Sequence, residues 1–291
     1  MTTVATTLLA GLVLGSIYIL VGVGYNIVLI ASGAFNFAQA AVVMLGTFLA
    51  STLAVEAGYP NIVVVLLCGL AGALVGLATE FVAIRPVVGK GQHGELVTTI
   101  GVSTVVTGLV VVVWGTDVRP VNPFISSDVL TIFGGRITVD ALVVIVVAVV
   151  ACLALWAWSR RTLNGLAALA VSEDRVAAKL RGINVNALSI LAMAVAGAIG
   201  GAAGPIIGTQ TLAVYTVAAV VTLKAFLVLI LGGMGSFPGL LLGGLIVGPI
   251  EALTARYAGG EYTTFVLLAL LLTVLLVRPQ GFFGARVERA V

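Results

Sequence analysis

Two ionisable side chains lie inside long apolar segments, where a charge is costly unless it has a partner or a function. These are Lys224 and Glu251, which fall in neighbouring segments on either side of a glycine-rich stretch. Pairing with each other, or extension toward a membrane interface, is the structural interpretation of both, and contact with a substrate is the functional one. A further charge, Glu80, precedes Arg85 by about one and a half helical turns, which predicts an ion pair near an interface.

The side chains needed for enzymatic chemistry are scarce. The only histidine is His93, and the two cysteines, Cys68 and Cys152, each stand alone in an apolar run. A phosphate-binding Gly-x-x-x-x-Gly-Lys-[Ser/Thr] loop is absent as well, because neither Lys90 nor Lys224 has that context. An intramembrane enzyme is therefore disfavoured, and we expect no cofactor in this chain. A self-sufficient secondary carrier stays open as an alternative, although only Lys224 and Glu251 are available for ion coupling.

Neutral polar residues gather near two interruptions of the apolar pattern, at Ser32–Gln39 and in the glycine-rich stretch Leu231–Gly239. Paired glycine- or proline-broken segments in the two halves of a membrane protein indicate a translocation site. An amino acid zwitterion needs hydrogen-bond donors for its carboxylate and acceptors for its ammonium group, and broken helix ends with nearby amides supply both. Helix–helix hydrogen bonding and core packing are the structural alternatives for these side chains.

We expect the translocation pathway to include Asn26, Phe35, Asn36, Phe37, Gln39, Thr99 and Ser103. Structural or gating roles are expected for Gly33, Lys224, Gly232, Gly233, Gly235 and Glu251.

The composition places these residues in a membrane. Of 291 residues, 61% are hydrophobic and only 9% are charged, whereas a soluble domain is about 45–50% apolar and about 25% charged. The 36 glycines suit close helix contacts in lipid. The net charge of +3 arises from a few short segments, so a nucleic-acid partner is excluded.

Nine apolar windows have the length of spanning helices or nearly so. We therefore predict an all-α, polytopic transmembrane helical bundle of about 8–10 spanning helices, with broken or re-entrant segments, as a single domain over residues 1–291. The two short windows between 217 and 254 are either two crossings or a broken, partly re-entrant hairpin. The windows cover residues 6–30, 38–55, 61–84, 96–114, 139–158, 187–208, 217–233, 239–254 and 262–277.

Charge orients the segments. Basic residues outnumber acidic ones in segments 85–95, 159–183 and 278–291, whereas acidic residues prevail in 115–140. Because cytoplasmic loops carry the excess of lysine and arginine, the first three segments are expected inside and the last outside. Nine crossings then place the N-terminus outside and the C-terminus in the cytoplasm.

A short helix in the loop at about 159–186 differs from the apolar segments. Ser172 is a suitable N-cap, acidic residues follow in the first turn, basic residues lie in the last turn, and Gly182 provides a stop. These signals predict a helix over 173–181, which is too short to be stable alone and must dock against another surface. A membrane-surface helix is the alternative. The residues involved are Ser172, Glu173, Asp174, Arg175, Ala177, Ala178, Lys179, Arg181 and Gly182.

These segments together resemble the LivH-type permease subunits of bacterial branched-chain amino acid ABC importers. The resemblance runs from about residue 8 to Gly284. It is carried by Gly15-Ser16-Ile17-Tyr18, Gly24-Tyr25, Gly33 to Gln39, Thr99-Ile100-Gly101-Val102-Ser103, Ala170 to Asn184, Leu223-Lys224-Ala225-Phe226 and Leu231 to Ser236.

The resemblance implies that the 173–181 helix is the coupling helix, which lies in a cleft of the ATP-hydrolysing subunit. Ala177, Ala178 and Gly182 fit the Glu-Ala-Ala-x-x-x-Gly pattern of that helix, but Val176 stands where glutamate is usual. The glutamate's role would then fall to Glu173 or Asp174.

The resemblance also implies the assembly around the chain. The partners would be a second permease subunit (LivM-like) or a second copy of this chain, two cytosolic subunits that bind ATP and Mg, and an extracytoplasmic substrate-binding protein. The location would be a bacterial cytoplasmic membrane, with the lipid bilayer as surroundings. The substrate would be branched-chain or related small amino acids, with urea and short amides as alternatives.

Overall fold

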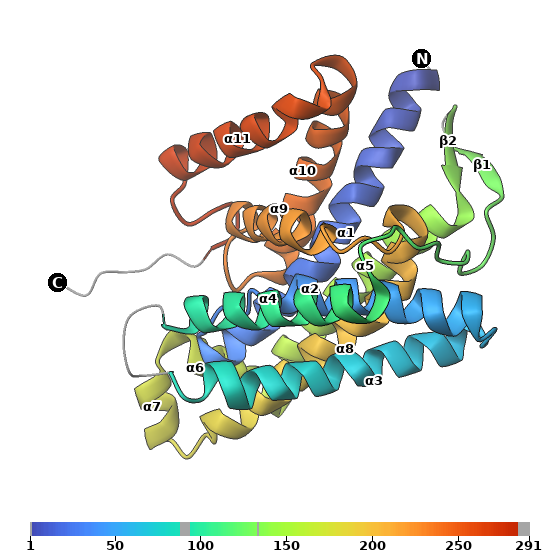
Figure 1. The fold of residues 1–291 in the computed structure, drawn as a ribbon. Helices are drawn as coiled ribbons and strands as arrows, with labels where there is room; N and C mark the ends of the chain where they lie inside the picture. The colour runs from blue at the N-terminus through green and yellow to red at the C-terminus, as the bar shows by residue number, and fades with distance from the viewer. Residues whose placement is uncertain (1, 88–93, 133, 285–291) are drawn as a thin grey trace.

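The computed structural model describes residues 2–87, 94–132 and 134–284, and shows helices with one small hairpin (Figure 1). Lys90, His93 and the charged tail beyond Gly284 lie outside this part. The elements are α1 (Thr2–Ser32), α2 (Gln39–Ala50) with a wider helical extension (Ser51–Glu56), α3 (Asn61–Thr79) with a similar extension (Glu80–Ile84), α4 (Gly94–Trp114), β1 (Val129–Ile132), β2 (Gly135–Thr138), α5 (Val139–Arg161), α6 (Leu163–Glu173), α7 (Arg175–Leu180), α8 (Val185–Thr211), α9 (Val217–Gly232), α10 (Phe237–Tyr257), a short turn (Gly260–Tyr262) and α11 (Thr263–Val277).

Each of the nine apolar windows coincides with a helix. Among the described residues, eight helices are long and apolar enough to cross a membrane. The exception is α9, whose 16 residues extend only about 24 Å, less than the ~30 Å hydrocarbon core. It packs against α10, and a turn of four residues, 233–236, joins the two helices. The segment 217–254 thus contains a hairpin with one short arm, and the all-α polytopic bundle is confirmed.

The first helix forms the centre of the bundle. Nearly every residue of α1 from Gly15 to Ser32 is buried, and the helix packs against α10, α8, α5, α9 and α2. By contrast, most apolar residues of α4 and α11 are exposed or only partly buried. The apolar helices of this bundle therefore have two kinds of surroundings. Helix α1 is covered by protein, whereas α4 and α11 leave apolar surface for lipid or a partner.

A β-hairpin lies in the segment that the sequence indicates only as a loop. Strands β1 and β2 are antiparallel, with Val129 opposite Thr138 and Ile132 opposite Gly135, and β2 packs against α1. Asp140 orders the preceding chain, since its carboxylate accepts hydrogen bonds from the backbone N–H groups of Ile125 (2.8 Å) and Phe124 (3.1 Å). Four-residue strands give too short an alternation to be recognised in the sequence.

The expected 173–181 helix is wrong in its bounds and its cap. Helix α6 continues to Glu173, and α7 begins only at Arg175. The N-cap is Asp174, whose extended backbone lets its carboxylate accept from the N–H groups of Val176 (2.8 Å) and Ala177 (3.0 Å). Ser172 instead donates to the Leu169 carbonyl inside α6. Several adjacent residues favour capping, and only the packing of α6 decides which one leaves the helix.

The predicted stop of that helix is confirmed. Gly182 has a φ of +85° directly after the C-cap Arg181, a conformation that glycine adopts without a steric penalty.

Glycines bring α3 and α8 into backbone contact. A methyl group added at Gly72 would lie 2.2 Å from the Gly197 carbonyl oxygen, and one added at Gly197 would lie 2.2 Å from the Gly72 carbonyl oxygen. On α4, in contrast, an added methyl at Gly101 meets nothing within 4 Å. Close approach of this kind is a main source of helix association in lipid.

We expect Gly72→Ala to lower the midpoint of thermal unfolding of the detergent-purified protein, because overpacking a tight contact costs about 1–3 kcal/mol. The matched control is Gly101→Ala, which adds the same methyl group on open α4 and should leave the midpoint unchanged or slightly higher. Equal midpoints for both variants would show that the α3–α8 contact has room to relax.

Candidate translocation site

The first interruption is a tight, internally bonded break between α1 and α2. At its start the Ser32 hydroxyl donates to the Val28 carbonyl (2.8 Å) and accepts from the Ala34 N–H (3.2 Å). Gly33 then takes a φ of +71°. At its end the Asn36 side-chain oxygen accepts from the Ala38 N–H (3.1 Å). The polar residues of this break therefore replace hydrogen bonds that a continuous helix would have made.

Two other buried polar side chains hold the break against neighbouring helices. Thr99 on α4 donates to the Glu95 carbonyl (2.7 Å) and accepts from the Phe37 N–H (3.3 Å). Gln39 donates to the Ala196 carbonyl on α8 (2.8 Å). Its side chain passes so close to Gly24 on α1 that a methyl group there would lie 2.2 Å from the amide nitrogen. The break is thus attached to three helices.

Asn26 joins the two interruptions. Its side-chain oxygen accepts from the Gly235 N–H (2.9 Å) in the turn between α9 and α10. That turn needs glycine, because Gly233 and Gly235 have φ values of +101° and +84°. Asn26 lies about 9 Å along α1 from Ser32, so the two breaks are held near one another by a single buried amide.

The C-terminal chain covers the second interruption. The N–H groups of Phe282 and Phe283 donate to the carbonyls of Leu231 (2.9 Å) and Gly232 (3.0 Å) at the end of α9. Behind them, Gly232 is in contact with Gly239, since a methyl at either glycine would lie 2.0–2.3 Å from the other's carbonyl oxygen. These bonds satisfy carbonyl groups that the helix end leaves free.

Four aromatic rings surround the first break. Phe226 on α9 lies 5.2 Å from Phe37 and 5.6 Å, edge-on, from Phe35, measured between ring centroids. Phe37 also lies 6.2 Å from the Tyr25 ring. Phe35, Phe37 and Phe226 are partly exposed, whereas Asn36 is 1% exposed. The accessible surface at the break is therefore aromatic, and the amides lie behind it.

Two amide atoms near the breaks keep unused hydrogen-bonding capacity. Within the described part of the chain, the Asn26 side-chain nitrogen and the Gln39 side-chain oxygen are buried without a hydrogen-bond partner. One is a donor and the other an acceptor, and an unsatisfied buried polar atom costs about 1–3 kcal/mol.

The structure brings together most of the expected pathway residues. Asn26, Phe35, Asn36, Phe37, Gln39 and Thr99 all contact one of the two breaks or a helix that holds it. Ser103 lies one turn further along α4, and its backbone carbonyl accepts from Thr107 (2.8 Å). The sequence reasoning missed Phe226 as a site residue, although it follows Lys224 by two positions in a segment that carried the family resemblance.

Lys224 and Glu251 form the ion pair that the sequence indicates. Their side chains are 14% and 8% exposed, and the second Glu251 oxygen accepts from the Tyr18 hydroxyl on α1 (2.9 Å). The Lys224 ammonium also lies 5.8 Å from the centre of the Tyr18 ring. Tyr18 is buried in the core of the bundle and links α1 to this charge pair between α9 and α10.

The expected pairing of Glu80 with Arg85 is wrong. Glu80 is buried and accepts from the Ser189 hydroxyl on α8 (2.9 Å). The Arg85 guanidinium lies over the Phe81 ring, 5.6 Å from its centre. The helix widens over Glu80–Ile84, which changes the side-chain directions that regular α-helical spacing implies.

The short helix α7 contacts the first break directly. An Nη1 atom of Arg175 donates to the Ser32 carbonyl at 2.7 Å. Ala178 packs against Val171, Val185 and Leu188, while Val176 and Leu180 are 67% and 84% exposed. One side of α7 is therefore bound to the bundle, and its apolar side chains face outward.

Residues 7–275 match the family described as "Branched-chain amino acid transport system / permease component". The chain belongs to this permease family.

Among its relatives, the branched-chain amino acid transport permease protein LivH of Escherichia coli strain K12 is 33% identical over 94% of this chain and 93% of its own length. BraD of Pseudomonas aeruginosa, named likewise, is 30% identical over 95% and 94%. The fructose import permease protein FrcC of Rhizobium meliloti is 26% identical over 90% of this chain and 74% of its own length.

A solved structure, PsaBC from Streptococcus pneumoniae in complex with Fab, has a similar fold. The TM-score is 0.50 at 14% identity, over 94% of this chain and 91% of that one. At this identity the similarity concerns the fold alone. The permease is thus a polytopic membrane transport component in family and in architecture.

We expect Lys224→Met to lower the thermal stability of the permease, because removing one partner of a buried pair leaves an uncompensated charge that costs about 3–5 kcal/mol. The double variant Lys224→Met, Glu251→Met should recover much of this loss. The control is Lys179→Met on exposed α7. Thermal unfolding in detergent measures all three, and a double variant less stable than the single one would contradict the pairing.

Proposed function

We propose that the permease forms one transmembrane half of an ATP-driven importer for branched-chain or related small amino acids. The observation that carries the proposal is α7, a six-residue helix at the basic end of the bundle that exposes Val176 and Leu180 and contacts the first break through Arg175. A cytosolic partner that docks on α7 would cover these exposed apolar side chains and would act on the first break through Arg175.

In this proposal α7 docks on an ATPase subunit. Val176 and Leu180 supply the apolar contact, and the small, exposed side chain of Ala177 permits close approach, while Ala178 packs α7 against the bundle. ATP and Mg are bound by two such partner subunits. The chain itself lacks a Walker-type phosphate loop, so its part of the work is to move substrate.

Arg175 transmits movement of α7 to the pathway. Its bond to the Ser32 carbonyl joins the docking helix to the residue at which α1 ends. A displaced α7 therefore pulls on the backbone that leads through Gly33 to the aromatic group. Charge-assisted hydrogen bonds of this kind contribute about 1.5–3 kcal/mol.

The pathway in this proposal runs past Phe35, Phe37 and Phe226, whose partly exposed rings suit the apolar side chain of a branched-chain amino acid. The unused donor of Asn26 and acceptor of Gln39 match the carboxylate and ammonium groups of a zwitterion. A second permease subunit, or a second copy of this chain, forms the opposite wall.

Charge supports an orientation with α7 and the C-terminus in the cytoplasm. Arginine and lysine are concentrated around 159–183, while the opposite end holds the hairpin and the N-terminus of α1. An extracytoplasmic binding protein then delivers substrate to that opposite end.

The names of LivH and BraD support branched-chain amino acids as the substrate, and that of FrcC shows that the wider relatives include sugar permeases.

Reconstitution tests the function. The permease is placed in proteoliposomes with its partner permease, with or without the ATPase subunits and binding protein encoded beside it. We expect ATP-dependent uptake of leucine, isoleucine or valine only in the complete assembly. Urea, acetamide and fructose serve as the comparison substrates. Uptake by the permease alone, driven by an ion gradient, would contradict the proposal and favour a secondary carrier.

We expect Arg175→Gln to leave assembly with the ATPase intact but to lower substrate transported per ATP hydrolysed about tenfold, since ~1.4 kcal/mol corresponds to a factor of ten. Arg181→Gln, at the end of the same helix, removes the same charge without touching Ser32 and should keep the wild-type ratio. A normal ratio for Arg175→Gln would show that coupling runs through other contacts.

A further inference from the structure

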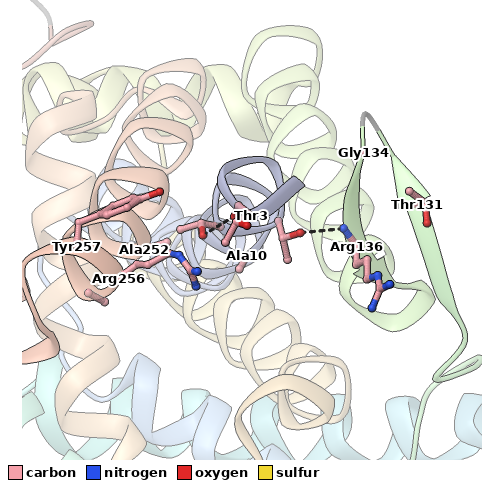
Figure 2. Close-up of a pocket in the computed structure, with 11 residues that line it drawn as sticks. Thr3, Ala10, Thr131, Gly134, Arg136, Ala252, Arg256 and Tyr257 are labelled. Carbon is pink, nitrogen blue, oxygen red and sulfur yellow. Dashed lines mark hydrogen bonds between the residues drawn. The ribbon is translucent and has the colours of Figure 1, made fainter. Parts of the chain in front are cut away.

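An open groove of about 1140 Å³ lies at the end of α1 that is remote from α7. Figure 2 shows that α1 forms its floor, with α10 on one side and the β1–β2 hairpin on the other. Its polar lining comes from Thr3, Thr7, Thr131, Arg136, Arg256 and Tyr257. Neither the pathway nor the docking of α7 makes use of this groove.

The two arginines of the groove are unpaired. Arg136 projects from β2 and Arg256 from the last turn of α10, and both are exposed. In the part of the chain that the structure describes, neither guanidinium has an ion-pair or hydrogen-bond partner, and the groove lining contains no acidic residue. Arg119, by comparison, is paired with Glu56 at 2.5 Å.

The arginines are held in place by the fold. The backbone N–H of Arg136 donates to the Thr6 hydroxyl at 3.1 Å, which fastens the hairpin to α1. Gly135 packs so closely on α1 that a methyl there would lie 2.8 Å from the Ala5 carbonyl carbon. Arg256 is carried by α10, which contacts α1 along its length. The backbones from which the two arginine side chains extend are therefore anchored on either side of the groove.

The groove lies outside the hydrocarbon layer. Helix α1 has 31 residues, which span about 46 Å, so its first turns extend beyond a ~30 Å core. A two-stranded hairpin with open edges is also not tolerated in lipid. In the proposed orientation this end is extracytoplasmic. That end of the molecule contains three basic residues, Arg119, Arg136 and Arg256. The two without a partner, Arg136 and Arg256, both line the groove.

We propose that this groove is the docking site for acidic side chains of the importer's extracytoplasmic binding protein, an inference that rests on the proposed function. The groove exceeds the ~300–1,000 Å³ of small-molecule sites and fits a segment of protein. Guanidinium groups bind carboxylates in a bidentate geometry, and the threonine hydroxyls add hydrogen-bonding capacity at the floor of the groove. Complementary charge at such a site raises the rate of encounter and selects the partner.

The test uses the complete importer in phosphatidylcholine proteoliposomes. The double variant Arg136→Glu, Arg256→Glu is compared with wild type and with Arg136→Lys, Arg256→Lys, which keeps the charge. We measure ATP-driven uptake as the binding protein concentration is varied. We expect the charge-reversed variant to need at least about tenfold more binding protein than wild type for half-maximal uptake. The lysine variant, which keeps the charge, should need much less binding protein than the charge-reversed variant. Raising the salt concentration should weaken the wild-type response more than that of the charge-reversed variant.

Two controls and three possible outcomes decide the result. Thermal unfolding checks that the variants are folded, and reversal of acidic residues on the binding protein should restore the response of the charge-reversed variant. An unchanged half-maximal concentration overturns the docking site. If the variants instead differ only when phosphatidylglycerol is added to the vesicles, the groove binds a lipid headgroup and the proposal is overturned. Absence of ATP-driven uptake in the wild-type assembly would contradict the proposed function itself, and is thus a separate failure.

Discussion

A break in a membrane helix frees backbone N–H and C=O groups that have no water to bind, so protein must supply their partners. This requirement organises the centre of the permease. Ser32 and Asn36 bond within the first break, Thr99 reaches it from α4, and Asn26 bonds the second break from α1. Because several of these partners come from other helices, the irregular backbone is held by tertiary contacts, and any movement of those helices changes its shape.

Helix α1 connects the parts that these bonds hold. Its C-terminal end accepts the Arg175 bond from α7, its middle carries Asn26, and Tyr18 bonds the Lys224–Glu251 pair between α9 and α10. The opposite end forms the floor of the outer groove. One largely buried helix thus contacts α7, both breaks and the groove. In the proposed function, these contacts are a route by which movement of α7 reaches both breaks.

Much of the site was predictable from the sequence where a local rule applied. Glycine at 33, 182, 233 and 235 indicated breaks or stops, and each has a positive φ. Isolated charges in apolar runs suggested either pairing or extension toward an interface for Lys224 and Glu251, and the structure shows the pair. The two wrong predictions for charged and polar side chains concern partners that local spacing does not decide. Asp174 rather than Ser172 caps α7, and Glu80 pairs with Ser189 rather than Arg85.

The pattern of apolar, charged and glycine residues was enough to identify the membrane as the surroundings, the helices and the positions of their interruptions, because these properties act through neighbouring residues of one chain. The folded arrangement was needed to show which apolar helix lies at the centre, which aromatic rings surround the break, and that Arg136 and Arg256 line the same groove. These features join residues tens to hundreds of positions apart. Their energies depend on packing between helices whose apolar faces look alike in sequence, and steric fit at glycine contacts chooses among them.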